Sequence, residues 1–394
     1  MTASPQVPRP DEWRRPKDRV DVARGAIDEV STILARLEVR SLFLVADETA
    51  YRGSGAEDLL RSELSTRQVE RFTHFQCDPK LSDVARGIQC FRQNHVDAVL
   101  AIGGGSALDM AKLVSNLGMQ QEPPEHLVRG KSRLLHDGPP LIAVPTTAGT
   151  GSEATHFAVC YMDGEKYSLA HRFLLPEFAI VDPQLTQNLP PQLTASSGLD
   201  ALCQAVESLW AVDSNELSVQ HASEAARLAF DHLAAAVHEP TAAIRTAMCR
   251  AAHLAGQAIN ISKTTASHAI SYAISMRAGV PHGMAVAMTL APVLLYNAKT
   301  SVTDCVDPRG AEHVRSRIGF ILQLLGSSTP LEAAKKIENL VGGVGGPTRL
   351  SEIGMGSDAE VEMLVRSVNT ERLSNNPRRV TPDDLRRLLE SVRY

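Results

Sequence analysis

Short apolar runs that alternate with longer amphipathic segments fill the first half of the chain, and they restrict its fold more than any other feature. Residues 41–47, 97–105 and 140–147 each form an apolar run that ends in turn residues, as buried strands do. Between these runs, residues 81–94 and 108–117 have the apolar spacing of helices. This alternation predicts an α/β layer with a mostly parallel sheet.

The second half of the chain has a different pattern, in which alanine-rich segments with helical spacing replace the apolar runs. These segments cover residues 200–210, 216–236, 242–260, 268–274 and 314–325. A last strand at 178–182 is followed by a proline-rich stretch, where we place a domain boundary. We therefore predict an α/β dinucleotide-binding domain over 1–190 and an all-helical domain over 191–394.

Length and composition are those of a soluble protein with two full domains. The chain has 394 residues, and its formal net charge of −5 does not favour nucleic-acid binding. Its six cysteines form no CxxC pair, which suits a reducing cytoplasm. The basic N-terminus lacks the apolar core of a secretory signal, and no apolar run approaches the roughly 20 residues that span a bilayer. We expect a cytoplasmic protein without a membrane or nucleic-acid partner.

Polar residues follow the first two predicted strands. Asp47 ends the first strand, where a carboxylate can accept both hydroxyls of an adenosine ribose and repel the extra phosphate of NADP. The loop after the second strand consists of Gly103, Gly104, Gly105 and Ser106. A helix expected to begin near Ala107 would direct its first amides and its dipole at a diphosphate held there. This loop is not a GxGxxG motif, and alone it also fits a simple strand-to-helix turn.

A third polar loop follows the third predicted strand. Its hydroxyl groups belong to Thr146, Thr147, Thr150 and Ser152. Hydroxyls and free amides there can bind the ribose, the diphosphate or the nicotinamide amide. All three loops stand at carboxyl ends of predicted strands, where open α/β sheets bind ligands. Together they predict a dinucleotide site.

Four side chains of the second half can form a metal site. Asp200 and Gln204 are four residues apart on a predicted helix, so both project from one face. His268 lies on another helical segment, and Pro281 before His282 favours a helix start at that histidine. A carboxylate and two imidazoles can hold a divalent transition metal and leave a position open for a substrate oxygen. Each residue alone also fits a hydrogen-bonded core position, and the ligand types do not separate iron from zinc, manganese or nickel.

Four motifs occur in an order and spacing that resemble the iron-dependent (group III) alcohol dehydrogenases. They are GGGSALDMAK at 103–112, PTTAGTGSE at 145–153, GLDAL at 198–202 and PHGMAVAM at 281–288. The similarity extends from about Arg24 to the C-terminus. It implies a dinucleotide-binding domain joined to a helical domain, a nicotinamide cofactor, Fe²⁺ (or Zn²⁺ or another divalent ion), and a homodimer or larger oligomer.

The resemblance also implies roles for single residues. Asp200, His268 and His282 would be metal ligands, and residues 103–106 would form the diphosphate loop. Thr146, Thr147 and Lys166 would complete the cofactor pocket, to which we also assign Asp109 of the first motif. Asp47 matches the position at which members that prefer NAD over NADP carry an acid, so NAD(H) is the favoured cofactor.

Two residues depart from the family pattern. Gln204 stands where the family usually has a histidine, and its amide oxygen is a weaker ligand than imidazole. The site is therefore expected to bind iron less tightly or to accept a different metal. Tyr272 stands where many members have another histidine near the nicotinamide, and its hydroxyl can replace that group as a proton donor.

Residues 259–272 and 368–381 are similar to a narrower branch of the family, the phosphonoacetaldehyde reductases of phosphonate natural-product biosynthesis. A phosphonate dianion needs several charge-assisted donors. Candidates for these donors are Lys263, Arg372, Asn375, Asn376 and Arg379. The predicted reaction is the metal-dependent, NAD(P)H-linked reduction of phosphonoacetaldehyde to 2-hydroxyethylphosphonate.

Three other functions fit the same motifs. An alcohol or diol dehydrogenase of the same family would act on small uncharged alcohols, and Lys263 would then be incidental. A cyclase of the dehydroquinate synthase type would reoxidise its cofactor in each cycle and consume no net NADH. A nucleotide-binding protein whose metal site has decayed through Gln204 would have no activity at all.

Overall fold

The computed structural model describes residues 22–368 and 370–394, and these residues form two compact units. The first unit contains the described residues up to Thr146 together with Ser152–Asp182. The second contains Thr147–Gly151 and Pro183–Tyr394, so one short segment of the third polar loop packs with the helical part of the chain.

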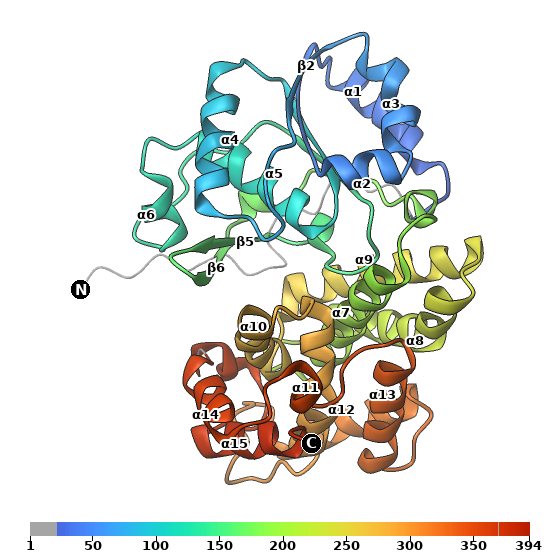
Figure 1. The fold of residues 1–394 in the computed structure, drawn as a ribbon, viewed down its shortest axis with the longest axis vertical. Helices are drawn as coiled ribbons and strands as arrows, with labels where there is room; N and C mark the ends of the chain where they lie inside the picture. Colours follow the sequence, from blue (N-terminus) through green and yellow to red (C-terminus); the bar gives the residue numbers. More distant parts are fainter. Residues whose placement is uncertain (1–21, 369) are drawn as a thin grey trace. The chain divides into compact units, whose positions relative to one another are not determined.

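A parallel five-stranded sheet forms the centre of the first unit (Figure 1). Its spatial order is β2 (Gln68–Phe72), β1 (Ser41–Ala46), β3 (Ala98–Gly103), β4 (Leu141–Pro145) and β7 (Phe178–Ala179). Every neighbouring pair is parallel. The chain runs from β1 outward to β2 and then returns to β3 on the other side of β1. The strand order therefore reverses between β1 and β3, which is where open α/β sheets bind ligands.

Helices and an antiparallel hairpin complete the first unit. The helices are α1 (Glu29–Arg36), α2 (Glu48–Gly53), α3 (Ala56–Leu64), α4 (Leu81–Gln93), α5 (Gly105–Gly118) and α6 (Pro124–Val128). The hairpin pairs β5 (Phe157–Met162) with β6 (Glu165–Ala170). Helix α5 begins at Gly105, slightly before the start expected near Ala107. Almost all of α5 is buried because it packs on β1, β3 and β4.

The second unit is all-helical (Figure 1). Its helices are α7 (Pro191–Trp210), α8 (Glu216–His238), α9 (Ala242–Ser262), α10 (Ala266–Ala278), α11 (His282–Asn297), α12 (Ala311–Leu324), α13 (Pro330–Gly343), α14 (Asp358–Ser367) and α15 (Pro382–Ser391). Short 3₁₀ turns occupy Ala26–Asp28, Ser152–Ala154, Arg172–Leu174, Pro183–Thr186, Leu350–Ile353 and Thr370–Asn375. The predicted fold class, a parallel α/β domain followed by an all-helical domain, is confirmed. Among the described residues, no helix is long and apolar enough to cross a bilayer.

Helix α7 begins earlier than the sequence indicates. The helical pattern is clear from residue 200, and the preceding proline-rich residues resemble a linker. The structure instead begins the helix at Pro191, the position where a proline fits best because its missing N–H would be unpaired there anyway. From Gly198 to Trp210 every residue of α7 is buried, so this helix lies at the centre of the second unit.

A buried lysine connects α5 to the chain that follows the third polar loop. The side chain of Lys112 is fully buried, and its ammonium donates to the carbonyl oxygens of Thr155 and Phe157 at 2.9 and 2.8 Å. Burial lowers the pKa of Lys112 to about 8, although the charges of Asp109 and Glu153 act in the opposite direction. Lys112 thus fixes the entry to the β5–β6 hairpin.

Replacing this lysine should destabilise the first unit. Lys112→Met keeps an unbranched stem but removes the donor from the buried carbonyl oxygen of Thr155, which costs roughly 1–3 kcal/mol, and from the part-buried one of Phe157. We expect the first unfolding transition in calorimetry to fall by several degrees. Lys131→Met, the same change at an exposed position, serves as the control and should leave the transition in place. Equal transition temperatures for the two variants would contradict the assigned role of Lys112.

Candidate functional site

Asp47 and the glycine-rich loop lie together at the carboxyl end of the sheet in the first unit. Asp47 follows β1 and caps α2, since its Oδ1 accepts from the amide of Ala50 at 2.7 Å. Its own amide donates to the carbonyl oxygen of Ile102 in β3 at 3.3 Å. A Cβ on Gly103 would lie 2.7 Å from the Cβ of Ala107 and 3.4 Å from that of Asp47, and φ there is +148°. Only glycine therefore fits where the loop turns beside Asp47.

The turn into α5 has the geometry of an anion site. Gly104 precedes the helix, and Gly105 and Ser106 form its first turn, where amides lack partners within the helix. The Ser106 hydroxyl oxygen accepts from the amide of Asp78 at 3.1 Å. This bond ties the segment between β2 and α4 to the glycine-rich loop. The predicted residues 103–106 and Asp47 are thus brought together.

Thr146 lies at the same edge of the sheet, directly after β4, the strand next to β3. Its amide donates to the carbonyl oxygen of Gly103 at 2.9 Å. Its buried hydroxyl has no hydrogen-bond partner among the described residues. Buried hydroxyls are normally paired, so this one suits a bound polar group. Thr147 and Thr150 belong to the second unit.

Asp109 supports the third loop from within the protein. One carboxylate oxygen accepts from the hydroxyl of Ser152 at 2.6 Å, and the other accepts from the amide of Val159 at 2.9 Å. Burial raises the pKa of Asp109, while the charges of Lys112 and Lys166 act against that shift. Both carboxylate oxygens are therefore used to fix the loop. Lys166 is on β6, and the direct contact with a cofactor predicted for these residues stays a prediction.

Three side chains in the second unit form a candidate metal centre. Asp200 comes from α7, His268 from α10 and His282 from the first residue of α11. One ligand atom of each lies within 4.8 Å of the others, and both Asp200 and His268 are buried. A carboxylate oxygen and two imidazole nitrogens at this spacing suit Fe²⁺, Zn²⁺ or a similar ion.

Gln204 supplies a fourth donor atom, one turn after Asp200. Its amide nitrogen donates to Oδ2 of Asp200 at 3.1 Å and to the carbonyl oxygen of Thr150 at 3.3 Å. Its buried Oε1 has no hydrogen-bond partner in the described part of the chain. A buried acceptor without a donor costs about 1–3 kcal/mol, and a cation beside Asp200 would remove that cost. The residues present therefore fit a divalent ion.

Gly283 brings the start of α11 against α7. A Cβ at this position would lie 1.9 Å from the carbonyl oxygen of Ser196 and 2.9 Å from the amide of Asp200. Only glycine permits this approach, and the approach puts His282 beside Asp200. The expectation that His282 stands at a helix start is confirmed, with Pro281 as the preceding cap residue.

Tyr272 lies next to the two histidines. It follows His268 by one turn of α10, and its ring stacks on that of His282 with centroids 5.4 Å apart and planes inclined by 4°. The rings of His268 and His282 are 5.6 Å apart. Tyr272 thus lies beside one of the three candidate ligands, and its part in proton transfer stays a prediction.

Glu207 is a further member of this cluster, which the sequence analysis missed. Its fully buried carboxylate is hydrogen-bonded to Nδ1 of His268, whose Nε2 lies 3.2 Å from Oδ1 of Asp200. Burial alone would lower the pKa of His268, but the charge of Glu207 and the hydrogen bonds that the imidazole donates to both carboxylates raise it to about 9. The spacing of Asp200, Gln204 and Glu207 on one helix face was the signal available in the sequence.

The candidate phosphonate donors divide into two places. Lys263 ends α9 with a φ of +56°, and its exposed ammonium lies 3.0 Å from Oδ2 of Asp213. The amide nitrogen of Asn375 donates to the carbonyl oxygens of Ser262 and Thr264 at 2.7 and 3.0 Å. Asn375 therefore holds the turn that carries Lys263, and its amide nitrogen is occupied by the backbone.

Two of the remaining candidates, Asn376 and Arg379, make their contacts with other segments than the turn that carries Lys263. Asn376 is buried and pairs with the amide of Asn297. Arg379 is exposed, and its backbone bonds to Asp304 and to the hydroxyl of Tyr296. The side chain of Arg372 lies outside the described residues. The structure thus brings Lys263 and Asn375 together but gives no contact between them and Arg379.

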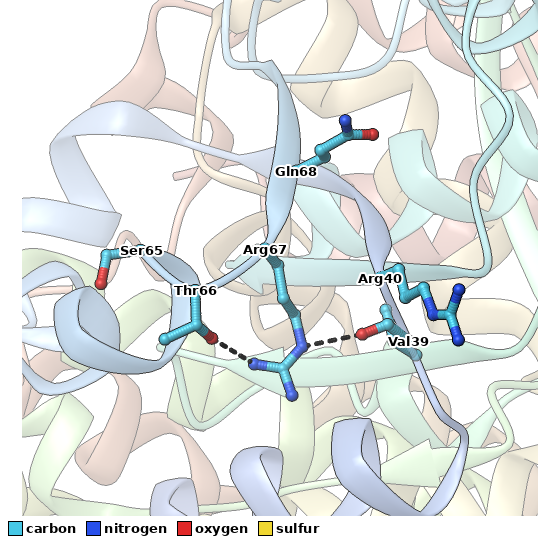
Figure 2. A pocket seen from close by; sticks show the side chains of 6 residues that line it. All are labelled: Val39, Arg40, Ser65, Thr66, Arg67 and Gln68. Atoms are coloured by element: carbon cyan, nitrogen blue, oxygen red, sulfur yellow. Dashed lines mark hydrogen bonds between the residues drawn. The ribbon is translucent and has the colours of Figure 1, made fainter.

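A surface depression in the first unit is not part of either site. It is lined by Val39, Arg40 and the segment 65–68 and lies where β1 and β2 begin, at the end of the strands opposite to Asp47 (Figure 2). The guanidinium of Arg67 donates to the carbonyl oxygen of Val39 and to the hydroxyl of Thr66 at 3.0 and 3.1 Å (Figure 2). The same guanidinium also forms an ion pair with the carboxylate of Glu63. The guanidinium of Arg67 is therefore already paired within the protein.

Comparison with known proteins gives the family. Residues 18–183 match the iron-containing alcohol dehydrogenases, and residues 194–393 match the C-terminal domain of the Fe-containing alcohol dehydrogenase family. A phosphonoacetaldehyde reductase of Streptomyces viridochromogenes is 36% identical over 78% of each chain. A long-chain-alcohol dehydrogenase of Geobacillus thermodenitrificans is 30% identical over 94% of each. The protein belongs to the iron-containing alcohol dehydrogenase family and is an oxidoreductase of that family.

A solved structure supports the same assignment. The sulfoacetaldehyde reductase of Bifidobacterium kashiwanohense, solved in complex with NAD⁺, superposes with a TM-score of 0.86 at 29% identity. The match covers 97% of this chain and 98% of the other. The architecture of both units is thus that of the family.

Adding one methyl group at Gly283 should disrupt the candidate metal centre. In Gly283→Ala the start of α11 must move away from Ser196, which displaces His282 from Asp200. We expect a lower melting temperature and less metal retained after loading with Fe²⁺ or Zn²⁺ and desalting, measured by elemental analysis. Gly319→Ala is the control, because nothing lies within 4 Å of the added methyl group in α12. Full metal retention by Gly283→Ala would contradict this account of the centre.

Proposed function

We propose that the protein is an NAD(H)-linked, metal-dependent reductase that converts phosphonoacetaldehyde to 2-hydroxyethylphosphonate. The observation that carries the proposal is the convergence of ligand atoms from Asp200, His268 and His282 within 4.8 Å. Next to them lies the amide oxygen of Gln204, which has no hydrogen-bond partner among the described residues. A carboxylate, two imidazoles and a neutral oxygen donor give a site that can still accept a substrate oxygen.

Cofactor binding follows from the loops of the first unit. The amides at the start of α5 would hold the diphosphate. Thr146 would donate its buried hydroxyl, which has no partner within the described part of the chain, to the cofactor. Asp47 would accept the ribose hydroxyls and repel the phosphate of NADP. Its Oδ1 already accepts from the amide of Ala50, which fixes the orientation of the carboxylate. The NAD⁺ complex of the sulfoacetaldehyde reductase supports the choice of NAD.

The chemistry divides between bound groups and side chains. When bound, the nicotinamide supplies the hydride and the metal ion acts as a Lewis acid toward the aldehyde oxygen. Asp200, Gln204, His268 and His282 would orient that oxygen by holding the ion in one place. The Tyr272 hydroxyl would donate the proton that the product oxygen needs, since its ring is stacked on His282.

The names of two relatives and the position of Lys263 favour an anionic aldehyde as the substrate. The reductases from Streptomyces viridochromogenes and Bifidobacterium kashiwanohense are named for aldehydes that carry a phosphonate and a sulfonate group, respectively. Lys263 stands five residues before His268, on the turn that Asn375 holds to Ser262 and Thr264. An ammonium in this place can bind a tetrahedral anion.

A second candidate is the reduction of small uncharged aldehydes. The ammonium of Lys263 is already paired with Asp213, and both side chains are about half exposed. The similarity to the long-chain-alcohol dehydrogenase of Geobacillus thermodenitrificans also favours an uncharged substrate, although a longer one. In that case Lys263 would be a surface residue with no part in substrate selection.

Substrate preference decides between the two candidates. We expect iron-loaded protein to oxidise NADH with phosphonoacetaldehyde at a kcat/KM hundreds of times that for propionaldehyde, roughly 3–4 kcal/mol of discrimination. Comparable values for both aldehydes would favour the uncharged substrates. Net NADH consumption would also exclude a cyclase, and no turnover with any aldehyde would contradict the proposed reaction.

Changes at the ion pair should alter this preference selectively. We expect Lys263→Met to lower kcat/KM for phosphonoacetaldehyde by about tenfold, the effect of one partly solvated charge-assisted bond. Propionaldehyde should react as in the wild type. Asp213→Asn removes the competing carboxylate and should raise kcat/KM for the phosphonate. Lys299→Met, at another exposed lysine of the second unit, is the matched control. Equal losses for both aldehydes would indicate a structural role for Lys263.

A further inference from the structure

We propose that Glu207 is a positioning residue that determines which ring nitrogen of His268 faces the metal ligands. The inference rests on the proposed metal centre and adds a residue that does not itself bind the ion. Its starting point is the hydrogen bond between the carboxylate of Glu207 and Nδ1 of His268, at a site where both side chains are buried.

The tautomer of His268 follows from this bond. An ionised carboxylate can only accept a hydrogen bond, so Nδ1 of His268 must carry a hydrogen. The other nitrogen, Nε2, faces Asp200, 3.2 Å from Oδ1. With an ion bound at this place, Nε2 would give up its hydrogen and offer its lone pair, while Nδ1 keeps its hydrogen on Glu207. That lone pair is what a metal ion requires from an imidazole.

Glu207 is itself held rigidly. Its Oε1 accepts from the hydroxyl of Thr265 at 2.6 Å and from the amide of Ser267 at 2.8 Å. The hydroxyl oxygen of Thr265 in turn accepts from the indole of Trp210 at 2.9 Å. The bonds to Oε1 leave Oε2 directed at His268, so the carboxylate cannot turn away without breaking several buried hydrogen bonds.

The two carboxylate oxygens therefore have separate tasks. Oε1 fixes the turn that leads into α10, which is a structural role. Oε2 is hydrogen-bonded to the imidazole of His268, which is the role proposed here. A substitution that changes Oε2 and preserves Oε1 separates the two.

Glu207→Gln is that substitution. The amide oxygen can replace Oε1 and accept from Thr265 and Ser267. The amide nitrogen then replaces Oε2 and must donate to Nδ1 of His268, which moves the ring hydrogen to Nε2. This variant keeps the bonds to Thr265 and Ser267, but the nitrogen that faces Asp200 carries a hydrogen and no longer offers a lone pair.

The measurement is the dissociation constant for Co²⁺ and Zn²⁺, obtained by competition with a chelator, for the full-length protein without substrate. We expect Glu207→Gln to bind these ions roughly 10–100-fold more weakly, which is the usual effect of removing the hydrogen-bond partner of a metal-binding histidine. Ser208→Ala is the matched control, because Ser208 is the next residue of α7 and also makes a buried hydrogen bond. The substitution removes the bond between the hydroxyls of Ser208 and Ser262, which are 2.7 Å apart. It should bind the ions like the wild type.

Each outcome has a separate meaning. Wild-type affinity in Glu207→Gln, or an equal loss in Ser208→Ala, would overturn the role of Glu207. A wild-type protein that binds neither ion would instead overturn the proposed metal centre. If Glu207→Gln does not fold, ¹⁵N-histidine spectra of the Zn²⁺-loaded wild type decide the matter. The signal lost in His268→Gln should show a hydrogen on Nδ1, and a hydrogen on Nε2 would overturn the inference.

Discussion

The arrangement of the second unit depends on a row of polar side chains in the buried face of α7. Asp200, Gln204 and Glu207 lie on this face, in a stretch where every residue is buried. Polar groups removed from water must find partners, or the fold loses several kcal/mol. The partners come from segments distant in sequence, namely His268 on α10, the turn before α10, and Thr150. The need to pair these groups therefore fixes where α10 and the 147–151 segment pack.

The first unit uses buried polar groups in the same way. Asp109 and Lys112, one turn apart on α5, hold the chain from Ser152 to Val159 through side-chain and backbone bonds. This chain follows β4, and α5 follows the glycine-rich loop. Two of the three loops that the sequence assigns to the cofactor are thus joined through one helix. The strands give the loops their common edge, and α5 fixes the third loop relative to the second.

The sequence predicts those parts of the fold whose burial is uniform. Strands β1, β3 and β4 are almost entirely buried, so they form continuous apolar runs. The edge strand β2, with the sequence QVERF, buries only Phe72 fully and was missed. The β5–β6 hairpin was also missed, although Asp163 and Gly164 at its turn, both with positive φ, form a dipeptide typical of tight hairpins. Local spacing identified Asp200 and Gln204, but the pairing of Glu207 with His268 joins residues 61 positions apart and leaves no local pattern.

Gln204 shows what the departure from the family's usual histidine adds. Its amide nitrogen reaches two acceptors, Oδ2 of Asp200 and the carbonyl oxygen of Thr150, while its oxygen remains without a partner among the described residues. A neutral imidazole has one N–H and one lone pair, so a histidine that binds a cation can donate to only one of those acceptors. Glutamine is the weaker ligand, but it orients the carboxylate of Asp200 and holds the 147–151 segment with the same group. Glutamine at this position is thus a weaker metal ligand than histidine, but it adds a hydrogen bond from the candidate metal centre to Thr150 of the 147–151 segment.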